Sequence, residues 1–213
     1  MKSSIDAIIR GEQARYLDGL LPFRDPLLLE IEAYAEEHRQ PIADPEVAQL
    51  MRVLVQARPP KHVLEIGTNI GYSVIVLGRE MQDGSTIETI EIDAATLDVA
   101  TDFVRRAELK SEIVFHQGPA LDVLPELEGT FDFVFIDCVK TEYSQYLDLI
   151  LPQLDKGGLV VFDNLLWKGE VAKGDRSPEP VALAELNKRI MTDPELVSIV
   201  LPLSDGVGIS VKV

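Results

Sequence analysis

The sequence predicts a single α/β domain: a mostly parallel sheet with helices on both faces and an antiparallel hairpin at its C-terminal end. Three observations predict this fold. From about residue 61, short apolar segments alternate with longer segments of helical spacing. Some of the short segments are apolar at consecutive positions, as strands buried on both faces are. The last two strand-like segments are joined by Ser204-Asp205-Gly206, and Asp-Gly is a strong hairpin signal.

Residues 1–57 are predicted to form a helical cap on this domain. Two helices are expected to begin at Asp25 and Asp44, each followed by a proline. An aspartate at this position accepts free N–H groups of the first turn, and proline is favourable in that turn. The helices are too few to enclose a core of their own. We therefore expect one domain, with the cap at 1–57 and the ligand-binding core at 58–213.

The core is predicted to contain five strands followed by the hairpin. The strands are rich in β-branched and aromatic residues and are expected at 62–67, 86–93, 113–118, 131–138 and 159–164, with the hairpin strands at 196–203 and 206–213. Helices are expected between them, among others at 93–109 and 141–154. Gly157-Gly158 is expected to mark the passage from the second of these helices into the fifth strand.

The charge of the chain argues against some partners. The 213 residues carry a net charge of −16. A negative surface opposes nucleic-acid phosphates, because affinity for them comes largely from Lys and Arg that displace counterions. It also makes a role at a membrane surface unfavourable. The acidic residues themselves are explained by solubility alone, so they indicate no partner.

Cysteine usage and hydropathy indicate a cytoplasmic protein. Cys138 is the single cysteine, which excludes an internal disulfide, and the three histidines form no zinc pattern. The first ten residues lack the features of a secretory signal, and no apolar run is long enough to span a bilayer.

Ligands of parallel α/β sheets bind beyond the carboxyl ends of the strands. The first strand ends in EIGTNIGYS (65–73), where Gly67 and Gly71 allow a tight turn close to a ligand. The turn matches neither the dinucleotide fingerprint nor a phosphate loop, and Glu65 before it suits a cationic ligand. Glu91 ends the second strand, 24 positions after Gly67, close to the offset of a ribose-binding acid. Alternatively, the glycine turn is a plain connection between strand and helix, and Glu91 is a solvated acid at a strand end.

Oxygen-bearing side chains end two further strands. Asp137 follows the fourth strand, and Asp163 and Asn164 follow the fifth. If these strands are neighbours, the three side chains meet at one rim as an all-oxygen site for Mg²⁺ or Ca²⁺, with positions left for a substrate. The alternative is that Asp163 caps a loop and Asp137 pairs with Lys140.

Lys140 is the candidate general base. A lysine ammonium is a poor base near neutrality, but burial and a nearby cation both favour the neutral amine. The cation also acidifies a hydroxyl bound to it, which makes proton transfer feasible. Without a metal site, a surface lysine would be the better interpretation. Cys138 is interpreted as a small buried residue and is given no role.

In these motifs the chain resembles a known family, the class I, metal-dependent O-methyltransferases of the catechol and caffeoyl-CoA type. The resemblance extends from about residue 40 to the end. It rests on several blocks in order: VLEIGTNIGYS, TIEID, QGPALDVLPEL, FDFVFIDCVKTEY, GGLVVFDNLLWKGEV and LPLSDGVGIS. It implies a Rossmann-like methyltransferase domain with a seven-stranded sheet whose last strands form a hairpin.

The resemblance also implies a role for each site residue. The pocket for S-adenosylmethionine would be contacted by Ala43, Glu65, Gly67, Thr68, Ser73, Glu91, Ala120 and Asp137, with Glu91 on the ribose and Ala120 near the adenine. Asp137, Asp163 and Asn164 would hold a divalent cation, Mg²⁺ or else Ca²⁺ or Mn²⁺, and Lys140 would act as the base. Trp167 would wall the acceptor pocket, or simply pack its loop. Val139 stands where plant members have an acid, so that donor contact is absent here.

The implied reaction is transfer of the methyl group of S-adenosylmethionine to a metal-bound hydroxyl of a small catechol-like or hydroxylated aromatic acceptor. Two alternatives stay open. The N-terminal part resembles bacterial members, including enzymes that methylate 5-hydroxyuridine in tRNA, although the loop after Trp167 lacks their basic stretch. The second alternative is a module that binds S-adenosylmethionine without catalysis. A homodimer is expected, because the N-terminal helices have more apolar positions than a small cap buries.

Overall fold

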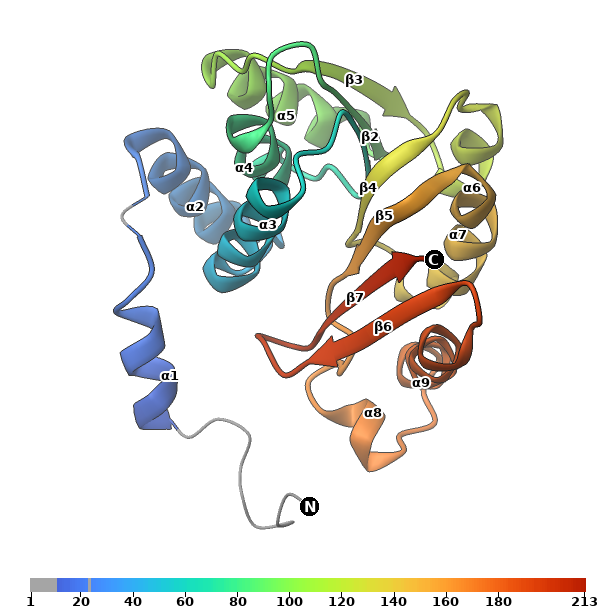
Figure 1. Cartoon of the computed structure of the whole chain (residues 1–213). Coiled ribbons are helices and arrows are strands. Elements are labelled where there is room, and N and C mark those ends of the chain that lie inside the picture. The colour runs from blue at the N-terminus through green and yellow to red at the C-terminus, as the bar shows by residue number, and fades with distance from the viewer. Residues whose placement is uncertain (1–10, 23) are drawn as a thin grey trace.

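Seven strands form one sheet in the order β3-β2-β1-β4-β5-β7-β6 in the computed structural model, which describes residues 11–22 and 24–213 (Figure 1). The strands are β1 (His62–Ile66), β2 (Thr86–Glu91), β3 (Glu112–Gln117), β4 (Phe131–Ile136), β5 (Leu154–Phe162), β6 (Leu196–Leu201) and β7 (Val207–Lys212). β1 to β5 are parallel, whereas β7 is antiparallel to both β5 and β6. The predicted fold class and the C-terminal hairpin are therefore confirmed.

Helices cover both faces of this sheet. They are α1 (Gly11–Asp18), α2 (Pro26–His38), α3 (Pro45–Ala57), α4 (Tyr72–Glu80), α5 (Ala94–Arg106), α6 (Ala120–Val123), α7 (Tyr143–Ile150), α8 (Glu170–Lys173) and α9 (Pro178–Thr192). One apolar core joins α2 to α5 to the sheet, and a second lies on the opposite face under α7 and α9 (Figure 1). Of the helices in the described residues, none combines the length and hydropathy needed to cross a membrane.

The passage into β5 differs from the prediction. The helix expected at 141–154 ends at Ile150, because the ring of Pro152 disfavours a continuing helix. β5 begins at Leu154, so Gly157-Gly158 lies within the strand and does not precede it. Phe131 pairs with Leu154 and Phe133 with Leu159, so a bulge separates the two pairs. Beyond the bulge the register leads to Asp163 directly after the strand.

Two helices of the cap, α2 and α3, begin at the predicted aspartates, but only one of these aspartates caps its helix through its side chain. Residues 1–10 of the predicted cap lie outside the described residues. Asp25 caps α2, accepting the backbone N–H groups of Leu27 at 2.9 Å and Leu28 at 3.3 Å. Asp44 precedes α3, but its side chain makes no capping bond; it accepts the hydroxyl of Ser204 instead. α3 therefore begins directly after Asp44 as predicted, with Pro45 in its first turn, but the expected capping bond from the Asp44 side chain is absent.

Candidate active site

The carboxyl ends of β1, β4 and β5 meet at one rim of the sheet. The backbone N–H of Asp137 donates to the carbonyl of Ile66 at 3.0 Å, and that of Asp163 donates to the carbonyl of Ile136 at 3.0 Å. These bonds continue the parallel ladder past the last strand residues. β1 and β4 are also the strands where the order of the sheet reverses, which is where open α/β sheets bind ligands.

A cavity of about 540 Å³ opens at this rim, and we call it the reaction cavity. Its walls come from the strand ends, from the segment before α3 and from the loop after β5. It brings together nine of the predicted site residues: Ala43, Gly67, Thr68, Ser73, Asp137, Lys140, Asp163, Asn164 and Trp167. The cavity is also lined by residues that were not predicted to belong to the site: Pro41, Ile42, Asp44, Asn69, Tyr72 and Cys138.

A smaller cavity of about 120 Å³ adjoins the first and shares Gly67 and Cys138 with it. Glu91 and Ala120, predicted to contact the ribose and the adenine, both line this second cavity. Val139 lies on its wall with a side chain that is 52% exposed. Seven of the residues predicted to contact S-adenosylmethionine therefore lie in the walls of two adjoining cavities. This is expected for a ligand with a polar amino-acid end and a nucleoside end.

Gly67 shows why the turn after β1 needs a glycine. Its φ angle is +108°, and a Cβ atom there would lie 2.4 Å from the carbonyl oxygen of Asp137. Any side chain would push β1 and β4 apart at the point where the two cavities meet. The glycine thus keeps the rim narrow enough for both strand ends to contact one ligand.

Glu91 is fixed by backbone groups. One carboxylate oxygen accepts the N–H of Asn69 at 2.8 Å, and the other accepts the N–H of Asp93 at 3.0 Å. The side chain is half-buried, not freely solvated. Each carboxylate oxygen keeps a second lone pair for a ligand hydroxyl.

Lys140 lies in the wall of the reaction cavity and is 8% exposed. Its Nζ atom is 2.5 Å from Oδ1 of Asp137 and donates to the hydroxyl oxygen of Tyr143 at 2.7 Å. The Tyr143 hydroxyl in turn lies 3.2 Å from the carbonyl of Ile136 and 3.3 Å from that of Asp163. Tyr143 therefore fixes the amine at the rim. The role of Tyr143 was not predicted, because it depends on packing at the rim.

Asp137 and Asp163 form the carboxylate part of the predicted metal site. Burial, and then the charge of Asp137, raises the pKa of Asp163 to about 7. A bound cation would relieve both effects, so the donor set fits a hard divalent ion. Among the described residues no three His, Cys, Asp or Glu side chains are grouped to hold a metal ion, and the predicted set takes its third oxygen from the amide of Asn164.

Glu65 lies behind the wall of the reaction cavity and does not line it as predicted. Its side chain is fully buried, and Oε2 accepts the hydroxyl of Thr89 at 2.5 Å. Oε1 is buried without a hydrogen-bond partner. Burial raises the pKa of Glu65 to about 8, although the hydroxyls of Ser73 and Thr89 act in the opposite direction. Burial therefore favours the protonated form of the Glu65 carboxyl.

This pKa makes a testable contribution to stability. Between the ordinary value of 4.5 and about 8, the folded state binds more protons than the unfolded chain, so the free energy of unfolding falls as pH rises. Glu65→Gln removes this slope and is expected to increase the free energy of unfolding above pH 8, on the order of a few kcal/mol. Urea unfolding of both proteins across this pH range measures it. Glu112→Gln, at an exposed position on β3, is the control. Parallel stability profiles for Glu65→Gln and the unmodified protein would contradict the assignment.

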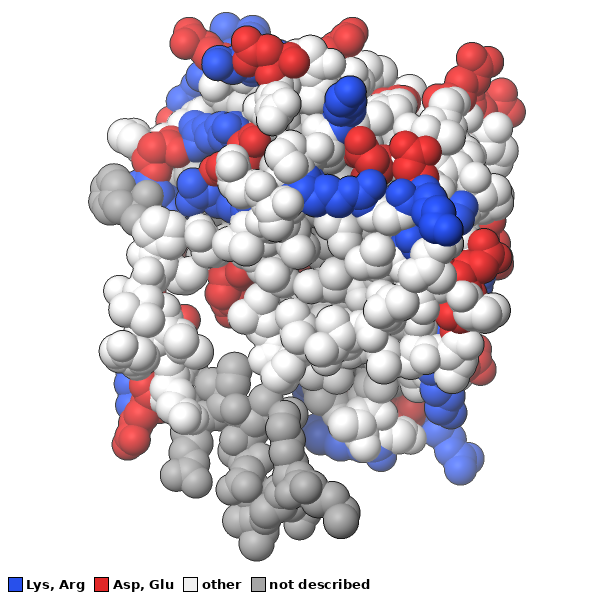
Figure 2. Space-filling model, viewed as in Figure 1, with Lys and Arg blue, Asp and Glu red and all other residues white. Residues whose placement is uncertain are grey.

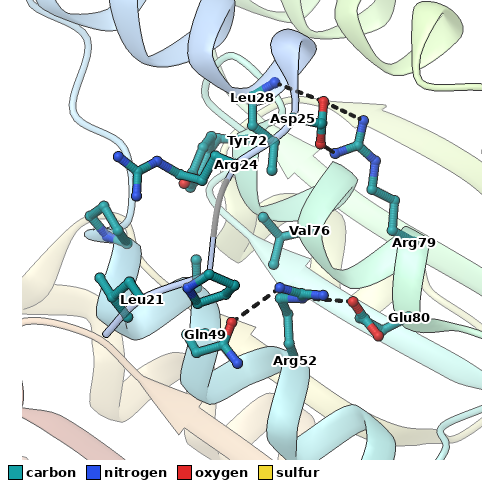
Figure 3. Close-up of a pocket in the computed structure, with 13 residues that line it drawn as sticks. Leu21, Arg24, Asp25, Leu28, Gln49, Arg52, Tyr72, Val76, Arg79 and Glu80 are labelled. Carbon is teal, nitrogen blue, oxygen red and sulfur yellow. Dashed lines mark hydrogen bonds and ion pairs between the residues drawn. The ribbon is translucent and has the colours of Figure 1, made fainter. Parts of the chain in front are cut away.

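A third hollow lies between the cap and α4, and Figure 3 shows two of its arginines, Arg52 and Arg79, paired with carboxylates. Nε of Arg24 is 2.7 Å from Glu32, Nε of Arg52 is 2.6 Å from Glu80, and Arg79 pairs with Asp25. The pairs of Arg52 and Arg79 tie the cap to α4, whereas Arg24 and Glu32 both belong to the cap. Tyr72 lines both this hollow and the reaction cavity, and its hydroxyl donates to Glu32 at 2.9 Å.

The chain is similar to O-methyltransferases both in sequence and in structure. The model of the O-methyltransferase family matches residues 27–213. The chain is 31% identical over 172 residues to caffeoyl-CoA O-methyltransferase of Petroselinum crispum, covering 75% of this chain and 71% of the relative. The structure of an O-methyltransferase from Bacillus cereus in complex with SAH is similar with a TM-score of 0.85 and 26% identity, over 93% of this chain and 96% of that one. The O-methyltransferase TomG from Streptomyces achromogenes in complex with SAM has a TM-score of 0.83 and 26% identity, over 93% and 94%.

Proposed function

Because the chain belongs to the O-methyltransferase family and is an S-adenosylmethionine-dependent enzyme of the caffeoyl-CoA type, we propose that it methylates a hydroxyl group of a small, catechol-like aromatic acceptor. One observation carries the proposal. The amine of Lys140 lies 2.5 Å from Asp137 in a cavity that also contains Asp163, Asn164 and Trp167. A candidate base, an oxygen donor set and an aromatic wall thus surround one space.

The donor is proposed to occupy both adjoining cavities. Its ribose would bind Glu91 and its adenine would lie near Ala120, while the amino-acid end and the sulfonium extend past Gly67 into the reaction cavity. A cationic ligand would in turn favour the ionised form of the Glu65 carboxyl behind this wall. The sulfonium methyl then faces the space beside Lys140, and the acceptor enters from the side of Trp167.

The proposed reaction is a direct displacement. Lys140 removes the proton of the acceptor hydroxyl as general base, and the oxygen attacks the methyl carbon. The carbon–sulfur bond breaks, its electron pair stays on sulfur, and S-adenosylhomocysteine leaves. Much of the rate would come from holding the two reactants in line. Tyr143 contributes by keeping the amine at the rim.

Asp137, Asp163 and Asn164 are proposed to hold a divalent cation, with Mg²⁺ the favoured ion. Such an ion supplies Lewis acidity that favours the ionised form of the acceptor hydroxyl. The buried carboxyl of Asp163, whose pKa is raised by burial and by the charge of Asp137, supports this part of the proposal. With three protein ligands, room remains for two vicinal oxygens, which suits a catechol.

A tRNA acceptor is the second candidate, and charge disfavours it. Arg24, Arg52 and Arg79 line one hollow, and each is paired with a carboxylate. Figure 3 shows the pairs of Arg52 and Arg79. In the loop after Trp167, Lys173 pairs with Glu170 at 2.7 Å. Phosphate binding requires cations that are free to replace counterions. The three arginines of the hollow and Lys173 of the loop are therefore already paired within the protein.

The choice of acceptor can be tested by labelling. A radiolabelled methyl-transfer assay should compare a catechol panel with tRNA that carries unmodified 5-hydroxyuridine. We expect label in at least one catechol and little in the tRNA, because the net charge of −16 opposes the approach of many phosphates. Efficient labelling of the tRNA with negligible labelling of every catechol would reverse the ranking. No labelling of either acceptor, with S-adenosylmethionine still bound, would favour the non-catalytic module.

A homodimer is also proposed. α1 buries none of its residues, and Tyr16, Leu17 and Leu20 are 68%, 50% and 61% exposed. The middle of the face in Figure 2, which overlies β6 and β7 in the view of Figure 1, shows few charged side chains. Light scattering at micromolar concentration should give twice the mass of the chain. A monomer mass would contradict the proposal.

A further inference from the structure

The loop that carries Trp167 has an unusual backbone. Asn164, Trp167 and Lys168 have φ angles of +61°, +46° and +55°, in the left-handed region that favours glycine. Non-glycine residues persist in such conformations only where surrounding contacts determine them. The position of Trp167 in the cavity wall therefore depends on whatever holds this loop.

The β6–β7 turn holds it by three hydrogen bonds. The N–H of Leu165 donates to the carbonyl of Gly206 at 2.8 Å, and the N–H of Leu166 donates to the carbonyl of Asp205 at 2.8 Å. On the other side of Trp167, the N–H of Lys168 donates to Oδ1 of Asp205 at 2.5 Å. Asp205 thus binds both neighbours of Trp167, one through its backbone and one through its side chain.

Gly206 of the turn packs closely against Leu166 of the Trp167 loop. Gly206 has a φ angle of +91°, and a Cβ atom there would lie 2.4 Å from Cγ of Leu166. The turn is itself closed by a bond from the N–H of Gly206 to the carbonyl of Leu203 at 2.8 Å. The turn and the Trp167 loop consequently form one interlocked unit.

We propose that Asp205 is a positioning residue that sets Trp167 in the wall of the acceptor pocket. It does not line the reaction cavity and contacts no reacting group. This assignment rests on the proposed function in one respect, that the acceptor binds beside Trp167. The Lys168 bond is the part that a side-chain substitution can remove, whereas the backbone bond to Leu166 remains.

Trp167 is the single tryptophan of the chain, so its fluorescence reports on this loop without any need for turnover. In Asp205→Ala we expect a red-shifted emission, greater acrylamide quenching and an acceptor KM raised by about tenfold, because small displacements of a positioning wall are costly. The dissociation constant of S-adenosylmethionine should not change. Asp205→Asn keeps Oδ1 as an acceptor and should restore both the emission and KM.

Asp193→Ala is the matched control, since Asp193 also accepts a backbone N–H, that of Glu195 at 2.9 Å, at the other end of β6. Emission and quenching of a folded Asp205→Ala variant that equal those of the unmodified protein would overturn the assignment. If Asp205→Ala does not fold, Asp205→Glu displaces the carboxylate by one methylene, and unchanged quenching there would overturn it too. If the fluorescence changes but no acceptor is methylated by any form, the positioning role stands and the proposed function fails.

Discussion

Replacing Lys140 by alanine is expected to lower turnover by about 10²- to 10⁴-fold, the usual contribution of a general base. The reason is that the amine faces the reaction cavity with Asp137 and Tyr143 holding it there. S-adenosylmethionine should still bind, because Lys140 has no proposed contact with the ribose or the adenine. Single-turnover methyl transfer and equilibrium titration of the donor measure the two effects separately.

Lys156→Ala is the matched control for this variant, because Lys156 is an exposed lysine on β5. It should retain full activity. Near-normal turnover in Lys140→Ala would remove Lys140 from the mechanism, and water or the cation site alone would then have to account for loss of the hydroxyl proton. Loss of donor binding together with turnover would instead indicate a structural role for the lysine.

Removing the proposed cation is expected to lower turnover at least as much as the Lys140→Ala substitution does. Excess EDTA should abolish methyl transfer, and Mg²⁺ should restore it. Asp163→Ala should lower turnover by about a thousandfold or more, since several kcal/mol of charge stabilisation would be lost. The substitution removes a buried carboxyl whose pKa is raised by burial, and with it the bond that Oδ1 accepts from the N–H of Asn164 at 2.7 Å, so folding is measured separately.

Asp155→Ala, which removes an exposed carboxylate from the same strand, is the control. Full activity in excess EDTA would place the enzyme among methyltransferases that need no metal. Circular dichroism and a urea titration should accompany the assay. If Asp163→Ala is inactive and unfolded, the chelation experiment alone decides the question.

The fold was predictable because its signals are local. Buried parallel strands are read from consecutive apolar residues, and the hairpin from Asp205-Gly206. The prediction failed where a distant partner decided the structure. Asp44 has the sequence of a helix cap, yet its carboxylate bonds to Ser204, 160 positions away. Gly157-Gly158 reads as a break before a strand but forms a bulge within it, because β4 determines the register.

The site was predictable to the extent that strand ends define it. Nine predicted residues line the reaction cavity because the carboxyl ends of neighbouring parallel strands share one rim. Residues that support them were missed, since their roles depend on packing. Tyr143 and Asp205 contact the site through other residues, and no spacing rule identifies such partners. Glu65 was placed in the pocket by resemblance, whereas burial puts it behind the wall.

The position of β7 in the sheet has a consequence for synthesis. β7 lies between β5 and β6 although it is the latest of the seven strands in the sequence. While the chain is being made, β5 therefore presents an unpaired edge until residues 207–212 have been translated. Open edges of this kind pair readily with other chains. Products truncated before residue 207 should aggregate, and chaperones that shield strand edges should bind the nascent enzyme late in translation.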